Sequence, residues 1–237
     1  MSSEPVFSGP AALSPADIAG FIDHTLLKPT ASEADILRLC SEAIEHGFKS
    51  VCVNPRWVKT TTKALRGSGV LTCSVAAFPF GATPTDVKVY EARGATLDGA
   101  EEVDVVIDIA AARANDRGAL VDDLQAVAEA VHASSSILKV IIETALLTDE
   151  QKVLACEAAV EAGADFVKTS TGFNGGGATV EDIALMRRTV GPHVGVKASG
   201  GVRTLDDARA MIAAGANRIG ASSGVAIVTG GAGVGSY

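Results

Sequence analysis

Short runs rich in Val and Ile alternate with longer segments of helical period along almost the whole chain. A run that is apolar at successive positions is typical of a strand buried on both faces, and such strands occur in parallel sheets covered by helices. The segments between these runs repeat their apolar residues at helical spacing. The predicted strands are 22–27, 50–54, 71–77, 103–108, 138–143, 165–169, 194–198 and 217–221, and the predicted helices are 32–46, 84–98, 121–133, 148–162 and 204–214.

Eight strand–helix units in roughly 215 residues fit a closed (β/α)8 barrel, the TIM barrel. The alternative is an open doubly wound sheet, in which polar residues would gather at one switch point. Candidate polar residues instead follow nearly every strand, and this distribution favours the barrel. We therefore predict one barrel domain over residues 15–229, a flexible segment over 1–14 and a flexible, glycine-rich tail over 230–237.

The composition limits the classes of partner. Hydrophobic residues make up 47% of the 237, enough for a large core, and the formal charge of -8 argues against a nucleic-acid binder. A local basic pocket for a phosphate is still compatible with that charge. The four cysteines form no C-x-x-C pair, which indicates reduced thiols in a cytosolic protein. Because no secretory signal or membrane-length apolar run is visible, we expect a cytoplasmic protein with no membrane partner.

Two lysines occur in similar settings, Lys168 in Phe-Val-Lys-Thr-Ser and Lys197 in Gly-Val-Lys-Ala-Ser. Each closes a short apolar run, where an ammonium group is costly to bury unless it has a task. An ammonium beside another is harder to keep protonated, and this is one way in which a lysine becomes a nucleophilic amine near neutral pH. The pair indicates covalent carbonyl chemistry through a Schiff base. Lys168 lies late in its strand and is the better placed to meet a substrate.

Acidic residues in the fourth strand offer partners for these lysines. Asp104 and Asp108 share one face of the predicted strand, and a carboxylate in such an apolar run needs a cationic partner. A purely structural buried ion pair is the alternative interpretation. In the fifth strand Lys139 points inward from a deeper position, and we interpret it as a supporting charge that pairs with Asp23 of the first strand.

Glycine-bearing turns follow the last two strands, and a short helical stretch, 225–228, comes after the second of them. TIM barrels commonly bind phosphate with the backbone N–H groups of these two loops and a helix N-terminus. One glycine-bearing turn alone usually has no binding function, but two such turns at adjacent strand ends predict a phosphate site. A glycine run over 174–177 is either a lip over the site or a plain loop. The predicted phosphate contacts are Gly200, Gly201, Arg203, Gly220, Ser222 and Ser223.

Several kinds of cofactor site have no counterpart in the sequence. No His/Asp/Glu cluster has the spacing of metal ligands, which argues against a metal-dependent aldolase. No G-x-G-x-x-G opens a helix after the first strand, and no G-x-S-x-G elbow is present. We therefore expect a reaction that needs neither a metal nor an organic cofactor.

Together these residues resemble the DeoC family of class I aldolases, from about residue 18 to residue 223. The order of the lysine motifs, with the aspartate strand upstream of them, makes the resemblance specific. The motifs are IDHTLLKP at 22–29, VCVNP at 51–55, EVDVVID at 102–108, KVIIET at 139–144, FVKTSTGF at 166–173, VKASGGVR at 196–203 and RIGASS at 218–223.

The resemblance implies reversible cleavage of 2-deoxy-D-ribose 5-phosphate to D-glyceraldehyde 3-phosphate and acetaldehyde, in deoxyribose phosphate catabolism. Lys168 would form the Schiff base, while Asp104 and Lys197 would transfer protons. The implied partners are small phosphosugars and aldehydes, without nucleic acid or membrane, and a homodimer is compatible with the sequence. Besides the phosphate loops, the implied substrate contacts are Asp23, Thr25, Lys139, Thr171 and Gly172.

Two further positions bear on this resemblance. Some family members end in a tyrosine on a mobile tail that helps to move a proton at the enamine carbon, and this chain ends in Tyr237 after a glycine-rich stretch. Some members also carry a lysine directly after the Thr-Gly of the Schiff-base motif, where this chain has Phe173. Phosphate binding would then depend more on Arg203 and on loop amides.

Two other functions remain open from the residues alone. One is a Schiff-base aldolase with a different donor or acceptor, such as a transaldolase-like enzyme. The other is a non-catalytic phosphosugar-binding barrel in which the lysines only hold anions.

Overall fold

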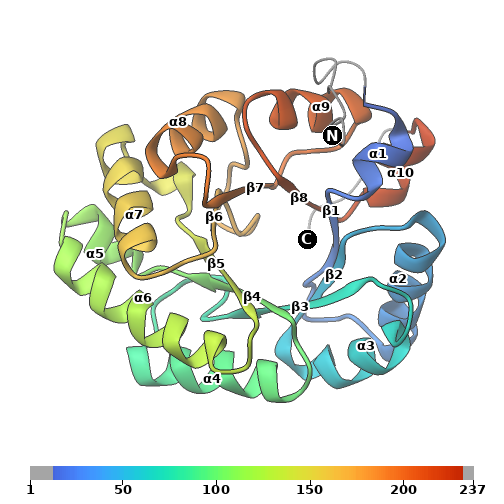
Figure 1. Ribbon diagram of the computed structural model, residues 1–237, viewed down its shortest axis with the longest axis horizontal. Coiled ribbons are helices and arrows are strands. Elements are labelled where there is room, and N and C mark those ends of the chain that lie inside the picture. Colours follow the sequence, from blue (N-terminus) through green and yellow to red (C-terminus); the bar gives the residue numbers. More distant parts are fainter. Residues whose placement is uncertain (1–12, 232–237) are drawn as a thin grey trace, which may run out of the picture.

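Eight parallel strands close into a barrel in the order of the chain (Figure 1) in the computed structural model, which describes residues 13–231. The closed order confirms the (β/α)8 barrel and excludes the open sheet. All eight predicted strands are present, and their ends differ from the prediction by at most two residues. The strands are β1 (Ile22–Leu26), β2 (Ser50–Val53), β3 (Leu71–Ala76), β4 (Glu102–Val106), β5 (Ile137–Ile141), β6 (Phe166–Lys168), β7 (Gly195–Ser199) and β8 (Arg218–Ala221).

Helices surround the barrel as an outer layer (Figure 1). The five predicted helices are confirmed as α2, α4, α6, α7 and α9, and the stretch 225–228 lies in α10. The helices are α1 (Pro15–Ala19), α2 (Glu33–His46), α3 (Val58–Leu65), α4 (Thr85–Leu97), α5 (Ile109–Arg113), α6 (Arg117–His132), α7 (Asp149–Glu161), α8 (Val180–Val190), α9 (Leu205–Ala213) and α10 (Gly224–Thr229), with 3₁₀ turns η2 (Pro55–Trp57) and η3 (Thr144–Leu146).

The sequence analysis did not predict α3 and α8, for a physical reason that is clearest in α3. Its sequence Val-Lys-Thr-Thr-Thr-Lys-Ala-Leu is rich in β-branched residues, which are poor helix formers. Val58, Thr61 and Leu65 are nevertheless buried along one side of the helix. Tertiary packing therefore outweighs the weak intrinsic propensity of this segment.

Several helices begin at a side chain that bonds their free backbone N–H groups. Ser32, Thr148 and Thr204 each accept a hydrogen bond from the third helical residue, whose side chain bonds back to the cap residue. Such a cap stabilises a helix by about 1 kcal/mol. Helix α2 ends at Gly47, whose φ of 67° is the left-handed conformation that glycine adopts without strain. Local sequence thus sets the helix ends.

The strands separate an apolar layer from a polar one. In β4, Val103 and Val105 are fully buried members of the large apolar core, which also includes residues of the surrounding helices. Glu102 and Asp104 alternate with them and are equally buried, but they form ion pairs with side chains from other strands. Because successive strand residues point to opposite faces, the apolar layer holds the helices while the barrel interior carries charges.

The ends of the folded domain differ slightly from the predicted boundaries. Leu13 is buried and Ser14 caps α1, so these two residues belong to the folded domain and not to a flexible segment. Gly230 ends α10, and the Gly231 N–H donates to the Ala226 carbonyl at 2.8 Å. The rest of both predicted flexible segments, including Tyr237, lies outside the described residues. Within 13–231 no helix has the length and apolarity needed to cross a membrane.

Candidate active site

The two lysines singled out in the sequence lie side by side on neighbouring strands, Lys168 as the last residue of β6 and Lys197 in the middle of β7. Lys168 of β6 is the register partner of Lys197 of β7, and both side chains are buried. Each ammonium nitrogen lies 2.8 Å from the same atom, Oδ2 of Asp104 in β4. The barrel therefore brings together the three residues to which the sequence analysis assigned the chemistry.

Asp104 carries more positive partners than the sequence indicated. Its second oxygen, Oδ1, accepts a hydrogen bond from Lys139 Nζ at 2.9 Å and from the Cys73 thiol. Burial alone would raise the pKa of this carboxyl group, but Lys139, Lys168 and Lys197 outweigh burial and hold the pKa well below its usual value. Asp104 is thus an anion that three ammonium groups share.

Lys197 has a second carboxylate besides Asp104. Its Nζ lies 2.5 Å from Oδ2 of Asp23 in β1. Burial alone would lower the pKa of Lys197, but Asp104 and Asp23 outweigh burial and raise the pKa above its usual value. Lys197 is therefore protonated at rest beside Lys168, which is the state that the proposed activation of Lys168 requires.

The partner predicted for Lys139 was wrong. Lys139 pairs with Glu102 at 2.6 Å and with Asp104 at 2.9 Å, whereas Asp23 pairs with Lys197 and Arg218. Lys139 is fully buried and its position deep in the barrel is confirmed. Its depth makes it a support for Asp104, while direct contact with a substrate stays a prediction.

Asp108 also departs from its predicted place. Strand β4 ends at Val106, so the alternation of strand faces does not extend to Asp108. The Asp108 carboxylate instead accepts a hydrogen bond from the Ala111 N–H and caps α5. Asp104 is therefore the only one of the two predicted aspartates that reaches the lysines.

Gly195 of β7 lies against an aromatic ring. A Cβ at this position would lie 2.2 Å from the Phe166 ring. The Phe166 ring fills this space, and the guanidinium carbon of Arg218 lies 5.3 Å from the centroid of that ring. Gly195 thus makes room for the aromatic support of a buried arginine.

The loop after β6 is fixed by a buried carboxylate. Glu143 accepts hydrogen bonds from the N–H and hydroxyl of Thr171 and from the amide of Asn174. Phe173, which follows Gly172, packs edge-on against Phe78 with ring centroids 5.3 Å apart. The Phe78 ring centroid lies 6.0 Å from Lys168 Nζ. Thr171 is buried, and Phe173 of this loop packs against the ring of Phe78, the residue after β3 and Ala77 that borders the lysine.

The predicted phosphate residues lie on neighbouring strand ends. Gly200 and Gly201 have φ angles of 79° and 81°, so the turn after β7 requires glycine. Arg203 and Gly201 are exposed, and Ser222 and Ser223 are half-buried after β8. The Ala178 N–H donates to the Gly200 carbonyl at 2.9 Å, which joins the loops after β6 and β7.

Gly220 lies in β8 and not in the loop after it. A Cβ at Gly220 would lie 2.3 Å from the Ser199 hydroxyl oxygen and 3.1 Å from Cε of Lys197. The glycine therefore makes room chiefly for the Ser199 side chain and also for the Lys197 stem, and this role is independent of any phosphate. Thr25, in β1, donates its hydroxyl to the Asp23 carbonyl at 2.8 Å and lies buried beside the charged cluster.

Sequence reasoning gave no role to three residues that the structure places in or beside the site. Glu102 and Arg218 point into the barrel and pair with each other at 2.8 Å. Phe78 borders both Lys168 and an outer groove. The alternation of faces along β4 and β8 could have identified Glu102 and Arg218, because each lies two positions from a residue that was assigned to the site.

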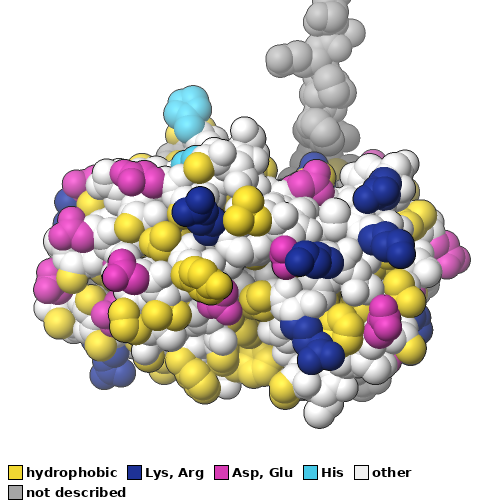
Figure 2. Space-filling view, turned by 90° about the horizontal axis from the view of Figure 1, so that it is seen from below, with side chains coloured by type: hydrophobic (Ala, Val, Ile, Leu, Met, Phe, Trp, Pro, Cys, Tyr) yellow, Lys and Arg dark blue, Asp and Glu magenta, His cyan; other side chains and the backbone are white. Residues whose placement is uncertain are grey.

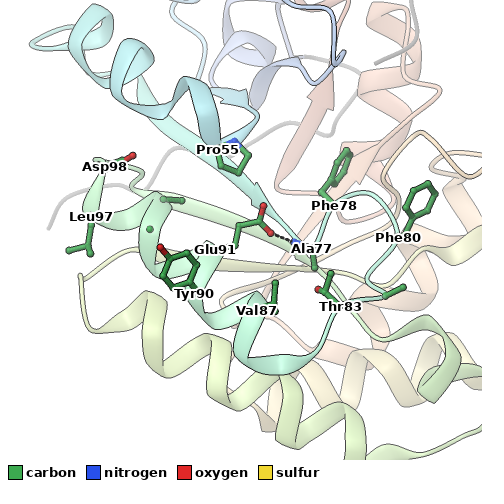
Figure 3. A pocket seen from close by; sticks show the side chains of 13 residues that line it. Pro55, Ala77, Phe78, Phe80, Thr83, Val87, Tyr90, Glu91, Leu97 and Asp98 are labelled. Atoms are coloured by element: carbon green, nitrogen blue, oxygen red, sulfur yellow. Dashed lines mark hydrogen bonds between the residues drawn. The ribbon is translucent and has the colours of Figure 1, made fainter.

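A groove of about 790 Å³ lies next to the barrel mouth, on the side of α4 (Figure 3). It is mainly apolar, and Phe78 forms one end of it while Tyr90 and Leu97 lie at the other. The charged cluster does not line this groove. The groove is therefore a feature of the outer surface, separate from the lysines.

Two thiols next to Asp104 raise the question of a metal. Ligand atoms of Cys52, Cys73 and Asp104 lie within 4.8 Å of one another. Three ammonium groups already bind the Asp104 carboxylate, and their charge repels a metal cation. Burial raises the pKa of the Cys73 thiol, which disfavours the thiolate that a metal would need. This cluster does not fit a metal site.

A (β/α)8 barrel whose mouth holds a buried lysine pair on a shared carboxylate defines a class of protein: a barrel enzyme equipped for amine chemistry on carbonyl compounds. The comparisons with known proteins narrow this class. The model of the DeoC/LacD family of aldolases matches residues 18–230, and the chain belongs to that family.

Named relatives agree with this assignment. The chain is 61% identical to the deoxyribose-phosphate aldolase of Micrococcus luteus, over 92% of this chain and 97% of that protein. It is 58% identical to the deoxyribose-phosphate aldolase of Bacillus subtilis, over 90% and 95% of the two chains. A solved tetrameric deoxyribose-phosphate aldolase from Aeropyrum pernix superposes with a TM-score of 0.86 at 35% identity, covering 91% of each chain.

Proposed function

We propose that this protein is a deoxyribose-phosphate aldolase, which reversibly cleaves 2-deoxy-D-ribose 5-phosphate to D-glyceraldehyde 3-phosphate and acetaldehyde. The observation that carries the proposal is the pair Lys168 and Lys197 on one oxygen of Asp104. An amine must be neutral to attack a carbonyl carbon, and a neighbouring cation favours the neutral form. The names of the relatives support the choice of substrate.

The reaction follows from the positions of these groups. The neutral Lys168 amine attacks the aldehyde carbon and gives a carbinolamine. Oδ2 of Asp104 lies 2.8 Å from the ammonium nitrogens of both Lys168 and Lys197, so Asp104 and Lys197 transfer the protons with which water leaves, and an iminium forms. The C3 hydroxyl group gives its proton to Asp104 as the C2–C3 bond breaks; the iminium accepts the electron pair of that bond, D-glyceraldehyde 3-phosphate is released and an enamine remains on Lys168. Protonation and hydrolysis of the enamine release acetaldehyde and free Lys168.

Trapping with borohydride tests this function against its alternatives. Borohydride reduces an imine to a stable secondary amine, so acetaldehyde should leave a two-carbon adduct on the protein. The same experiment with a transaldolase-type ketose donor should leave none. If no aldehyde is trapped at any pH, the protein is a phosphosugar-binding barrel and not an aldolase.

The phosphate is proposed to bind at the loops after β7 and β8, near Gly201 and Ser223. Gly201→Val forces a side chain into a left-handed turn, and Ser223→Glu adds a negative charge at the start of α10. We expect both variants to raise KM for 2-deoxyribose 5-phosphate at least tenfold, about 1.4 kcal/mol. Activity on unphosphorylated 2-deoxyribose should change little.

This prediction is tested by comparing the activities of each variant on the phosphorylated and the unphosphorylated sugar. If both substrates lose activity equally, the damage is structural and the phosphate binds elsewhere. Ser222→Ala is the matched control, because it keeps the backbone N–H groups and adds no charge. Arg203→Gln measures separately how much the exposed guanidinium contributes.

We propose a cytoplasmic homodimer whose contact covers the groove beside α4. Phe80, Tyr90 and Leu97 there are 65%, 82% and 73% exposed, and hydrophobic side chains extend along this side of the molecule among scattered charges (Figure 2). Patches of this kind mark contact surfaces. Sedimentation as a 24.0 kDa monomer, unchanged in Tyr90→Lys, would contradict the proposal.

A further inference from the structure

The interior of the barrel holds one continuous cluster of charged side chains from six strands. All of its members are at most 5% exposed. Three are carboxylates and four are cations, and ion pairs connect every member to at least one other. The members are Asp23 of β1, Glu102 and Asp104 of β4, Lys139 of β5, Lys168 of β6, Lys197 of β7 and Arg218 of β8.

The upper part of the cluster is the site described above. Asp104 binds Lys139 at 2.9 Å and Lys197 at 2.8 Å, and Lys197 continues to Asp23 at 2.5 Å. In this part each of the two flanking lysines has two carboxylate partners, because Lys139 also binds Glu102 at 2.6 Å.

The lower part closes the cluster into a ring. Arg218 lies between the two remaining carboxylates, 2.7 Å from Asp23 and 2.8 Å from Glu102. Neither Glu102 nor Arg218 has an ion pair with Lys168. The ring therefore runs through six alternating charges, and the reactive lysine is attached to it only at Asp104.

The charges of the ring balance without Lys168. Three carboxylates face Lys139, Lys197 and Arg218, so a protonated Lys168 leaves one positive charge in excess in a buried site. Net charge is costly in such a place. Lys168 is also the one lysine of the cluster with a single carboxylate partner, and it shares that oxygen with Lys197. Loss of its proton is the change that neutralises the cluster.

We propose that Glu102 and Arg218 are positioning residues: through the charge of the ring they set the pH range in which the Lys168 amine is free to attack an aldehyde. The proposal rests on the function proposed above, in which Lys168 forms the Schiff base. Neither residue needs to touch the substrate. Their effect reaches Lys168 electrostatically, through a cluster from which solvent is largely excluded.

Other titratable groups near Lys168 also affect the net charge of the site. Cys73 of β3 is a neutral thiol, since burial raises its pKa, whereas the hydrogen bond from Cys73 lowers the pKa of Cys52 in β2. A thiolate at Cys52 would add a negative charge, so each measurement is repeated in a Cys52→Ala background. Glu143, after β5, is held by Thr171 and Asn174 and forms no ion pair with a lysine of the described chain.

The test measures the pH midpoint of borohydride trapping with acetaldehyde, read by mass, in Glu102→Gln and Arg218→Met. Arg218→Met removes the excess positive charge, so the midpoint should rise by about one pH unit. Glu102→Gln adds to the excess, so the midpoint should fall by about the same amount. Both variants keep every remaining member paired: Lys139 keeps Asp104, and Asp23 keeps Lys197.

The double variant separates charge from structure. Glu102→Gln with Arg218→Met removes one charge of each sign, so its midpoint should return to the wild-type value. Arg218→Lys keeps the charge and should leave the midpoint in place. A structural role would instead make the double variant the most disturbed. If Arg218→Met does not fold, Glu102→Gln and Arg218→Lys still decide the question.

The possible failures can be told apart. A wild-type protein that gives no adduct at any pH contradicts the proposed function and therefore the premise. Three results overturn this inference alone. The pH midpoint of trapping is unchanged in both single variants, it shifts in the same direction in both, or the double variant does not restore the wild-type midpoint.

Discussion

Lys168→Met is expected to abolish the borohydride-trapped acetaldehyde adduct and to lower turnover by at least roughly 10³-fold, about 4 kcal/mol in the barrier. Methionine fills a similar volume but has no amine, so no carbinolamine can form. The variant should still fold, because Asp104 keeps Lys139 and Lys197 as partners. The measurement is intact mass after reduction, followed by peptide mapping of the wild-type adduct.

Lys59→Met is the matched control for this prediction. Lys59 lies on the outer helix α3, and its side chain is 77% exposed, so its loss should leave both the adduct and the turnover unchanged. An adduct mapped to Lys197 or Lys139 in the wild-type protein would overturn the assignment of Lys168. The same holds if Lys168→Met is trapped as efficiently as the wild type.

The sequence was sufficient to predict the features that repeat along the chain, such as the strands. Eight apolar runs predicted eight strands, since a strand buried on both faces needs little beyond Val and Ile. The position of Lys168 and Lys197 followed from two local facts, their place at the end of a run and the face on which they lie. These are short-range properties. The structure confirms that the two lysines are register partners and that Lys168 ends β6, whereas β7 continues past Lys197 to Ser199.

Contacts across the barrel could not be obtained in this way. The pairing of Lys139 with Glu102 and of Arg218 with Asp23 depends on strand tilt and register around the closed barrel, which no single strand specifies. The prediction for Asp108 failed for a different reason, because the alternation of strand faces was extended past Val106, the last residue of β4. The hydrogen bonds of Glu143 to the loop after β6 join segments 28 residues apart, and no local pattern marks them.

The prediction for Asp104 concerns proton transfer directly. Asp104→Asn keeps the size of the side chain but loses the base, and general acid–base catalysis is typically worth roughly 10²–10⁴-fold. We expect turnover to fall by a factor in that range. The rate of imine formation should fall with it, because the carbinolamine then lacks the group that moves its protons.

The main alternative is that Asp104 only balances the charge of three lysines. Glu102→Gln distinguishes the two roles, since it removes an equally buried carboxylate from the same ring without touching Lys168. Loss of charge alone would slow both variants alike, whereas a proton-transfer role makes the loss in Asp104→Asn far larger at each variant's own optimum pH. Circular dichroism and thermal unfolding show whether each variant is folded. A folded Asp104→Asn protein with full turnover would make Asp104 a counter-ion, and Lys197 would then be the proton carrier closest to the Schiff base.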